Sequence, residues 1–163
     1  MAAVQIREQI KDPHVRIIFY TRERPSYLKS LFKQHLKVLM APSSSIENEL
    51  RAFLGRAIIH SDMERQTRIW REVFDDVRVI RFEDHAGSRN LLASFMKEVD
   101  RDLSFDISAP RNVSPDWAEL ELRRIKLIFG VRQLPDPDPE KRARFNEMIE
   151  AKVTAMIAAA LAE

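Results

Sequence analysis

Two short stretches of the chain have the apolar pattern of buried β-strands. Residues 15–20 (VRIIFY) are rich in β-branched and aromatic side chains with little alternation, which is typical of a strand covered on both faces. Residues 77–82 (VRVIRF) follow a turn and form the second candidate strand. The long stretch between them has helical periodicity, which excludes a hairpin, so the two strands should run parallel.

The other apolar positions recur at three- and four-residue spacing, which is the period of amphipathic helices. Ser44 with Glu47 resembles a capping box, Ser114 and Pro115 resemble a cap and a first-turn residue, and Gly130 is a natural helix stop. The pattern predicts helices over residues 25–40, 44–58, 62–74, 88–99, 114–129 and 138–162. The expected fold class is therefore α/β, with a partial parallel sheet of two strands flanked by about six helices.

The C-terminal helix, residues 138–162, has the most regular apolar stripe. Asp138 is placed to cap it and Pro139 to occupy its first position. The stripe comprises Phe145, Met148, Ile149, Val153, Met156, Ile157, Ala160 and Leu161. This helix either packs on its own domain or forms a dimer seam, and the pattern alone leaves both interpretations open.

Composition narrows the class of protein. A length of 163 residues is typical of a single domain, 1–163, with a substantial core. The formal charge of +2, with both signs interspersed, does not favour a general nucleic-acid binder. No cysteine is present, which fits a reducing compartment, and no apolar run reaches membrane-spanning length. We therefore expect a cytoplasmic protein without a membrane span.

Arg22 is the first candidate for chemistry, because it stands directly after the first predicted strand and just before a helix. Ligands of open parallel sheets sit beyond the carboxyl ends of the strands, where helix N-termini also attract anions. A guanidinium binds phosphate through two parallel hydrogen bonds, and the hydroxyl of Ser30, in the following helix, can add a third. The pair indicates a phosphate clamp, although a strand-end arginine in a plain ion pair would have the same sequence.

The other ionisable candidates carry less information. The four histidines are scattered without metal-ligand spacing. His35 lies at the edge of an apolar stripe, which favours a packing role. His60 could act as a general base, but nothing in the sequence pairs it with an orienting carboxylate. Residues 83–85 (EDH) follow the second strand and form either part of a site or a solvated turn.

Several segments resemble the family of sulfotransferases that use 3′-phosphoadenosine 5′-phosphosulfate (PAPS) as sulfuryl donor, and most closely its bacterial members. The similar segments, over roughly residues 14–130, are VRIIFYTRERPSYLKSLFKQHLK, RQTRIWREVFDDVRVIRFEDH, RNLLASFMKEV and RNVSPDWAELELRRI. The resemblance implies a P-loop-like fold and sulfuryl transfer to a hydroxyl or amine of a sugar, lipid or small molecule. It also implies that Arg22 and Ser30 bind the 3′-phosphate of PAPS, and that Arg111 and Asn112 approach the nucleotide or the acceptor.

The chain departs from this family in one large respect. The family's phosphate-cradling loop, rich in Gly, Lys, Ser and Thr, has no counterpart, and no G-x-x-x-x-G-K-[ST] pattern occurs in the 163 residues. The chain thus resembles the C-terminal portion of such an enzyme, its catalytic residues are not identified, and we expect the chain alone to be inactive. The alternatives are a non-catalytic module that binds a nucleotide or a partner, and a helical protein that dimerises.

Overall fold

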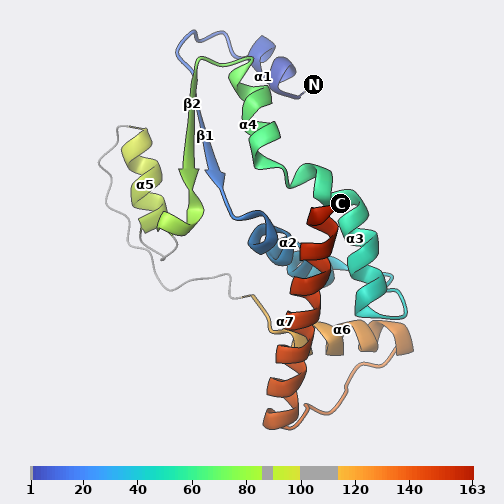
Figure 1. Cartoon of the computed structure of the whole chain (residues 1–163). Coiled ribbons are helices and arrows are strands. Elements are labelled where there is room, and N and C mark those ends of the chain that lie inside the picture. The colour runs from blue at the N-terminus through green and yellow to red at the C-terminus, as the bar shows by residue number, and fades with distance from the viewer. Residues whose placement is uncertain (1, 86–89, 100–113) are drawn as a thin grey trace. The chain divides into compact units, whose positions relative to one another are not determined.

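The computed structural model describes residues 2–85, 90–99 and 114–163 (Figure 1). The elements in chain order are α1 (Ala2–Gln9), β1 (Arg16–Thr21), α2 (Arg24–Val38), α3 (Ile46–His60), α4 (Met63–Arg71), β2 (Asp76–Arg81), the short 3-10 helix η1 (Phe82–His85), α5 (Asn90–Glu98), α6 (Trp117–Phe129) and α7 (Pro139–Ala162). The mixed α/β class and the two predicted strands are confirmed. The α1 helix was not predicted, because its short segment has no clear apolar stripe.

Contacts group the chain into two compact units, each built from two separate segments. One, which we call the strand unit, comprises Met1–Glu23 and Asp62–Asn112. The other, the helical unit, comprises Arg24–Ser61 and Val113–Glu163. The chain thus passes from one unit to the other between Glu23 and Arg24, then again at two later points. The assignment of all 163 residues to one domain stays a prediction.

In the strand unit, β1 and β2 pair in parallel as predicted. The register places Arg16 opposite Asp76 and Thr21 opposite Arg81. The Phe19 ring packs edge-on against Trp70 of α4 at 5.6 Å, whereas the hydroxyl of the next residue, Tyr20, lies 3.2 Å from Ser94 Oγ of α5. Successive side chains of a strand point to opposite faces, so α4 and α5 cover opposite faces of the sheet, as Figure 1 shows.

The helical unit encloses the larger apolar core. Helices α2, α3, α6 and α7 pack together around it. Its buried side chains are Leu28, Phe32, Leu36, Ile46, Leu50, Phe53, Leu54, Trp117, Leu120, Ile149, Val153 and Ile157. Burying each large side chain contributes roughly 1.5–3 kcal/mol, so this core is the main source of stability in the unit.

The stripe of α7 packs within the helical unit, which agrees with the first of the two interpretations. Ile149, Val153 and Ile157, spaced four residues apart, are buried against the neighbouring helices. Met148, which the stripe included, is instead 56% exposed. Position 148 lies about 100° around the helix from Ile149, so it falls outside the buried face.

Two of the predicted caps are wrong by one or two residues. The side chain of Ser45, not Ser44, caps α3 by accepting the N–H of Asn48 at 3.2 Å. Asp116, not Ser114, caps α6 by accepting the N–H of Glu119 at 2.8 Å. Neighbouring residues with similar cap chemistry compete in both places, and the backbone conformation decides between them. The caps and stops predicted for Asp138 and Gly130 are confirmed.

Candidate functional site

The carboxyl end of the β1–β2 sheet brings Arg22 next to residues that follow β2. Because Thr21 lies opposite Arg81, the residues after each strand emerge at the same edge of the sheet. The Arg22 guanidinium carbon lies 5.2 Å from the centre of the Phe82 ring, a cation–π distance. Its Nε lies 3.7 Å from Glu83 Oε1. The sequence predicted Arg22 and placed residues 83–85 in this region, but it did not identify Phe82 as a partner.

Glu83 is the acidic member of this group, and it is ionised. Desolvation acts to raise the pKa of its carboxyl, but the backbone N–H groups of Glu83 and Glu23 and the charges of Arg22 and Arg81 together lower that pKa. The N–H of Glu23 donates to Glu83 Oε1 at 3.1 Å. Among the residues that the structure describes, the buried Glu83 Oε2 has no hydrogen-bond partner. Glu83 is thus more than a solvated turn residue, because it holds the two strand ends together.

The contact between Arg22 and Glu83 is a loose one. Hydrogen bonds from a guanidinium to a carboxylate lie at about 2.7–2.9 Å, well below the 3.7 Å seen here. Within the described part of the chain, the Arg22 side chain donates no closer hydrogen bond, and one third of it (33%) is exposed. The donors of the Arg22 guanidinium are therefore without a close hydrogen-bond acceptor among the described residues.

The other residues predicted for the site, Ser30, Arg111 and Asn112, stay predictions. Ser30 lies half-buried in α2, between the core residues Leu28 and Phe32. It belongs to the helical unit, whereas Arg22 belongs to the strand unit. Arg111 and Asn112 lie outside the described residues.

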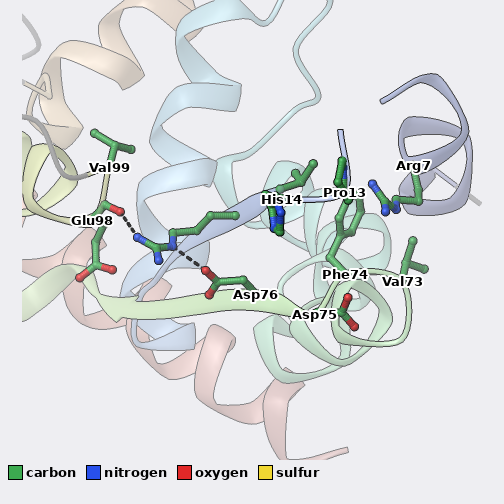
Figure 2. A pocket seen from close by; sticks show the side chains of 11 residues that line it. Arg7, Pro13, His14, Val73, Phe74, Asp75, Asp76, Glu98 and Val99 are labelled. Carbon is green, nitrogen blue, oxygen red and sulfur yellow. Dashed lines mark hydrogen bonds and ion pairs between the residues drawn. The ribbon is translucent and has the colours of Figure 1, made fainter. Parts of the chain in front are cut away.

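A cavity of about 530 Å³ lies at the opposite, amino end of the strands (Figure 2). Its polar wall is centred on Arg16, which donates to Asp76 Oδ2 at 2.6 Å and to the backbone oxygen of Glu98. The Arg16 hydrogen bond is the main cause of the lowered pKa of Asp76. At the other end of the cavity, Arg7 stacks on Phe74 at 5.6 Å. Arg16 links β1, β2 and α5, so these polar groups serve the fold, and ligands of parallel sheets bind at the other edge.

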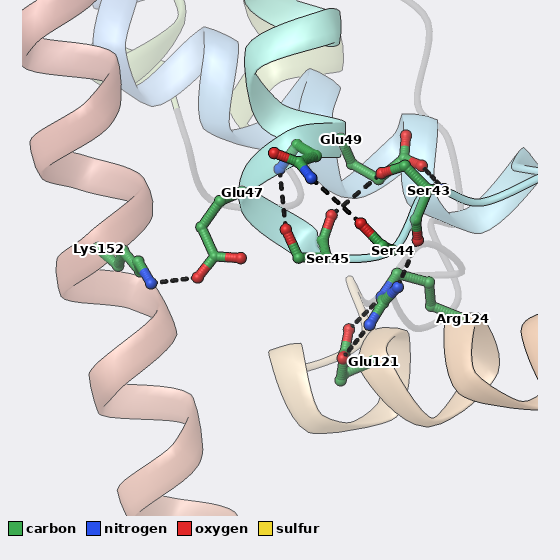
Figure 3. A network of polar contacts seen from close by, with 9 residues as sticks. Ser43, Ser44, Ser45, Glu47, Glu49, Glu121, Arg124 and Lys152 are labelled. Atoms are coloured by element: carbon green, nitrogen blue, oxygen red, sulfur yellow. Dashed lines mark hydrogen bonds and ion pairs between the residues drawn. The ribbon is translucent and has the colours of Figure 1, made fainter.

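A third polar cluster, in the helical unit, is structural (Figure 3). Buried Arg124 donates to both carboxylate oxygens of Glu121 and, at 2.6 Å, to the backbone oxygen of Ser43. The carboxylate of Glu49 accepts the N–H of Ser43. The Ser43 hydroxyl donates to the backbone oxygen of Ser45, so no activated serine is present here. These contacts hold the loop between α2 and α3 against α6.

His35 and His60 do not add to the candidate site. His35 packs against Phe32 and Phe53, with ring centres 6.3 and 5.5 Å away, which confirms the predicted packing role. Its Nε2 lies 3.6 Å from Glu49 Oε2. His60 is exposed at the end of α3. The residues that the structure describes contain no group of histidine and acidic side chains able to hold a metal ion.

Comparison of the chain with models of known families, with curated proteins and with solved structures finds no match. None of the described helices is both long enough and apolar enough to cross a membrane. The assignment to the sulfotransferases thus depends on the similar sequence segments, and it continues below as a proposal.

Proposed function

We propose that this chain is a sulfotransferase-like protein in which Arg22 binds the 3′-phosphate of PAPS at the carboxyl end of the β1–β2 sheet. The observation that carries the proposal is the state of Arg22, which is stacked on Phe82, half-buried and only loosely paired with Glu83. A planar guanidinium whose donors have no close acceptor is suited to bidentate contact with phosphate. Its position directly after a parallel strand is where such folds bind ligands.

Binding of phosphate requires a rearrangement of charge at this edge. Glu83 is ionised next to Arg22, and two like charges on one guanidinium repel each other. The phosphate therefore has to displace the Glu83 carboxylate from Arg22. The loss is small, because a partly exposed ion pair at 3.7 Å contributes little to stability. A doubly charged phosphate in bidentate contact is the stronger partner.

The finer parts of the function come from the sequence resemblance. In that view Ser30 is a second ligand of the 3′-phosphate, and Arg111 and Asn112 approach the nucleotide or the acceptor. The sulfuryl group would pass to a hydroxyl or amine, leaving adenosine 3′,5′-bisphosphate. The 163 residues contain no glycine- and lysine-rich loop to stabilise the leaving phosphate, so we expect the chain alone to bind the nucleotide without efficient transfer.

Titration with adenosine 3′,5′-bisphosphate by calorimetry tests the site. Hydrogen bonds to charged groups contribute about 1.5–3 kcal/mol, so Arg22→Ala should weaken binding roughly ten- to hundred-fold. Arg22→Lys keeps the charge but loses the planar set of donors, so its affinity for the nucleotide should lie between those of wild type and Arg22→Ala. Arg78→Ala is the matched control, because the Arg78 side chain is 56% exposed and pairs with Asp76 at the amino end of the same strand, away from the site. Equal affinities for wild type and Arg22→Ala would remove Arg22 from the site.

A second candidate function is a nucleotide-binding module without catalysis, which the missing loop favours. A sulfate-transfer assay with PAPS and a panel of hydroxyl and amine acceptors tests for catalysis by the chain. Nucleotide binding without turnover is expected of the module and also of a sulfotransferase-like chain that lacks the loop, so only turnover distinguishes the two. Robust turnover by the purified chain would show that another segment replaces the loop.

A further inference from the structure

The end of α6 exposes four large apolar side chains next to one another. Leu127, Ile128, Phe129 and Val131, which we call the apolar tip, are 43%, 40%, 72% and 38% exposed. Single exposed apolar residues are ordinary on protein surfaces, but a contiguous group of large ones marks an interaction surface. The tip belongs entirely to the helical unit, and nothing in the proposed nucleotide site uses it.

The tip is exposed because α6 extends beyond the core of its unit. The buried residues of this helix are Trp117, Ala118, Leu120 and Arg124, and none of the later residues is buried. The helix nevertheless stays regular to its end. Gly130 takes the left-handed conformation with φ 64°, and the N–H of Val131 donates to the Lys126 oxygen at 3.1 Å. This closure folds Val131 back beside the last turn, so the tip has a defined geometry.

The chain around the tip is basic. Residues 122–135 contain no aspartate or glutamate. Arg123, Lys126 and Arg132 flank the apolar side chains, and none of the three forms an ion pair in the part of the chain that the structure describes. Arg124 is different, because Glu121 neutralises it within the helical unit. The apolar tip is therefore accompanied by basic residues that form no ion pair among the described residues.

The direction of the side chains distinguishes between two kinds of partner. Leu127, Ile128 and Phe129 are consecutive, and each helical residue is turned by about 100° from the one before, so the three fan over roughly 200° of the helix surface. A protein partner usually contacts one stripe of a helix, at three- and four-residue spacing. A lipid bilayer is fluid, so a helix end that enters it is contacted on all sides at once. The spread of these three side chains therefore fits a lipid surface better than a rigid groove.

We propose that the apolar tip inserts into the interface of a bilayer that contains anionic lipids. The four apolar side chains would reach the boundary between headgroups and acyl chains, while Arg123, Lys126 and Arg132 contact lipid phosphates. Apolar insertion and basic residues act together in such surface binding, since either one alone is weak. This is attachment to one leaflet, and it needs no helix that spans the membrane.

Flotation of the full chain with vesicles is the test. Vesicles of phosphatidylcholine mixed with phosphatidylserine should bind the protein, vesicles of phosphatidylcholine alone should bind it much less, and added salt should weaken binding. The double variant Ile128→Ser and Phe129→Ser should lower the partition coefficient at least about ten-fold, since it removes two apolar side chains. Met148→Ser is the matched control, because Met148 is 56% exposed but lies on α7, outside the tip. It should bind like the wild type.

A second readout reports insertion directly. The chain has no cysteine, so Phe129→Cys and Met148→Cys each provide a single site for a polarity-sensitive dye. The dye at position 129 should shift to the blue on anionic vesicles, and the dye at position 148 should not. All these positions are exposed, so circular dichroism should show folded variants.

Three results would overturn the proposal. The first is equal vesicle binding by wild type and the Ile128→Ser, Phe129→Ser variant. The second is an unshifted dye at position 129 while the protein floats with the vesicles. The third is a dimer in sedimentation that the tip substitutions abolish without any vesicle binding, which would assign the tip to a second copy of the chain.

Discussion

Replacing Arg124 by leucine tests how much the buried polar cluster stabilises the helical unit. The Arg124 side chain is only 8% exposed. It donates two hydrogen bonds to Glu121, at 2.7 and 2.6 Å, and one to the Ser43 oxygen at 2.6 Å. Leucine removes all three contacts and leaves a carboxylate and a carbonyl without their donor, while the apolar volume is largely kept.

The expected loss follows from what remains after the substitution. Removing one partner of a buried ion pair costs about 3–5 kcal/mol, mainly because the other charge is left unpaired. The Glu121 side chain is 16% exposed, so water can partly replace the guanidinium there. The estimate therefore falls at the lower end of the range, at about 3 kcal/mol. For a chain of this length, that loss corresponds to a decrease in Tm of about 6–12 °C.

The two tryptophans allow the helical unit to be followed by itself. Trp70 belongs to the strand unit and Trp117 to the helical unit, where it is 2% exposed. In a Trp70→Phe background, urea denaturation followed by fluorescence reports the environment of Trp117 alone. Arg144→Leu is the matched control, because Arg144 and its partner Glu140 are 81% and 83% exposed. We expect the control to change the free energy of unfolding by less than about 0.5 kcal/mol.

A cost of less than about 1 kcal/mol for Arg124→Leu would contradict a stabilising buried cluster, because that value is typical of a surface pair. A double variant, Glu121→Leu with Arg124→Leu, sharpens the test. It leaves no unpaired charge, so it should be more stable than Arg124→Leu alone. If the double variant is less stable than Arg124→Leu alone, the loss of stability comes from packing and not from the unpaired charge.

Three further predictions concern single positions. Ile157→Ala should cost about 2–5 kcal/mol in urea denaturation, since Ile157 is 0% exposed, whereas Met148→Ala should cost almost nothing; equal costs would contradict the packing of α7. Gly130→Ala should cost about 1–2 kcal/mol from backbone strain alone, because φ is 64° and no atom lies within 4 Å of an added Cβ; an unchanged stability would argue against the left-handed cap. The hydrogen bond from Lys152 lowers the pKa of Glu47 from its usual 4.5 to about 2, so this carboxylate stabilises the fold fully above pH 4.5 and loses that effect as the pH falls towards 2. Glu47→Gln should remove this part of the pH dependence of the urea midpoint, and an unaltered profile would contradict it.

Much of the secondary structure could be predicted because its signals are local. The apolar run at residues 16–21 and the Asp138–Pro139 start of α7 each carry their information within a few positions. The caps at Ser45 and Asp116 were misplaced because neighbouring residues offer the same chemistry. Their choice depends on the backbone conformation, which sequence periodicity does not report.

The candidate site could be predicted only in part, since its partners meet through strand pairing. Arg22 was identifiable from its place after an apolar run. Its contacts with Phe82 and Glu83 depend on the register of β1 against β2, which fixes residues sixty positions apart in the sequence. The exposure of the last turn of α6 could not be predicted for a similar reason. The apolar pattern predicted a helix that ends at Phe129, but it did not show where the core of the helical unit ends.

The division of each unit between two segments has a consequence for synthesis on the ribosome. The helical unit needs Arg24–Ser61 and also Val113–Glu163, and its core includes Ile149, Val153 and Ile157 from the last helix. Domains generally fold as units as the chain emerges, the N-terminal parts first. Here α2 and α3 would leave the ribosome with Leu28, Phe32 and Leu50 uncovered. These side chains would stay exposed until almost the entire chain has been synthesised and α7 can cover them. During that interval, α2 and α3 would be the binding sites for a chaperone that recognises apolar segments.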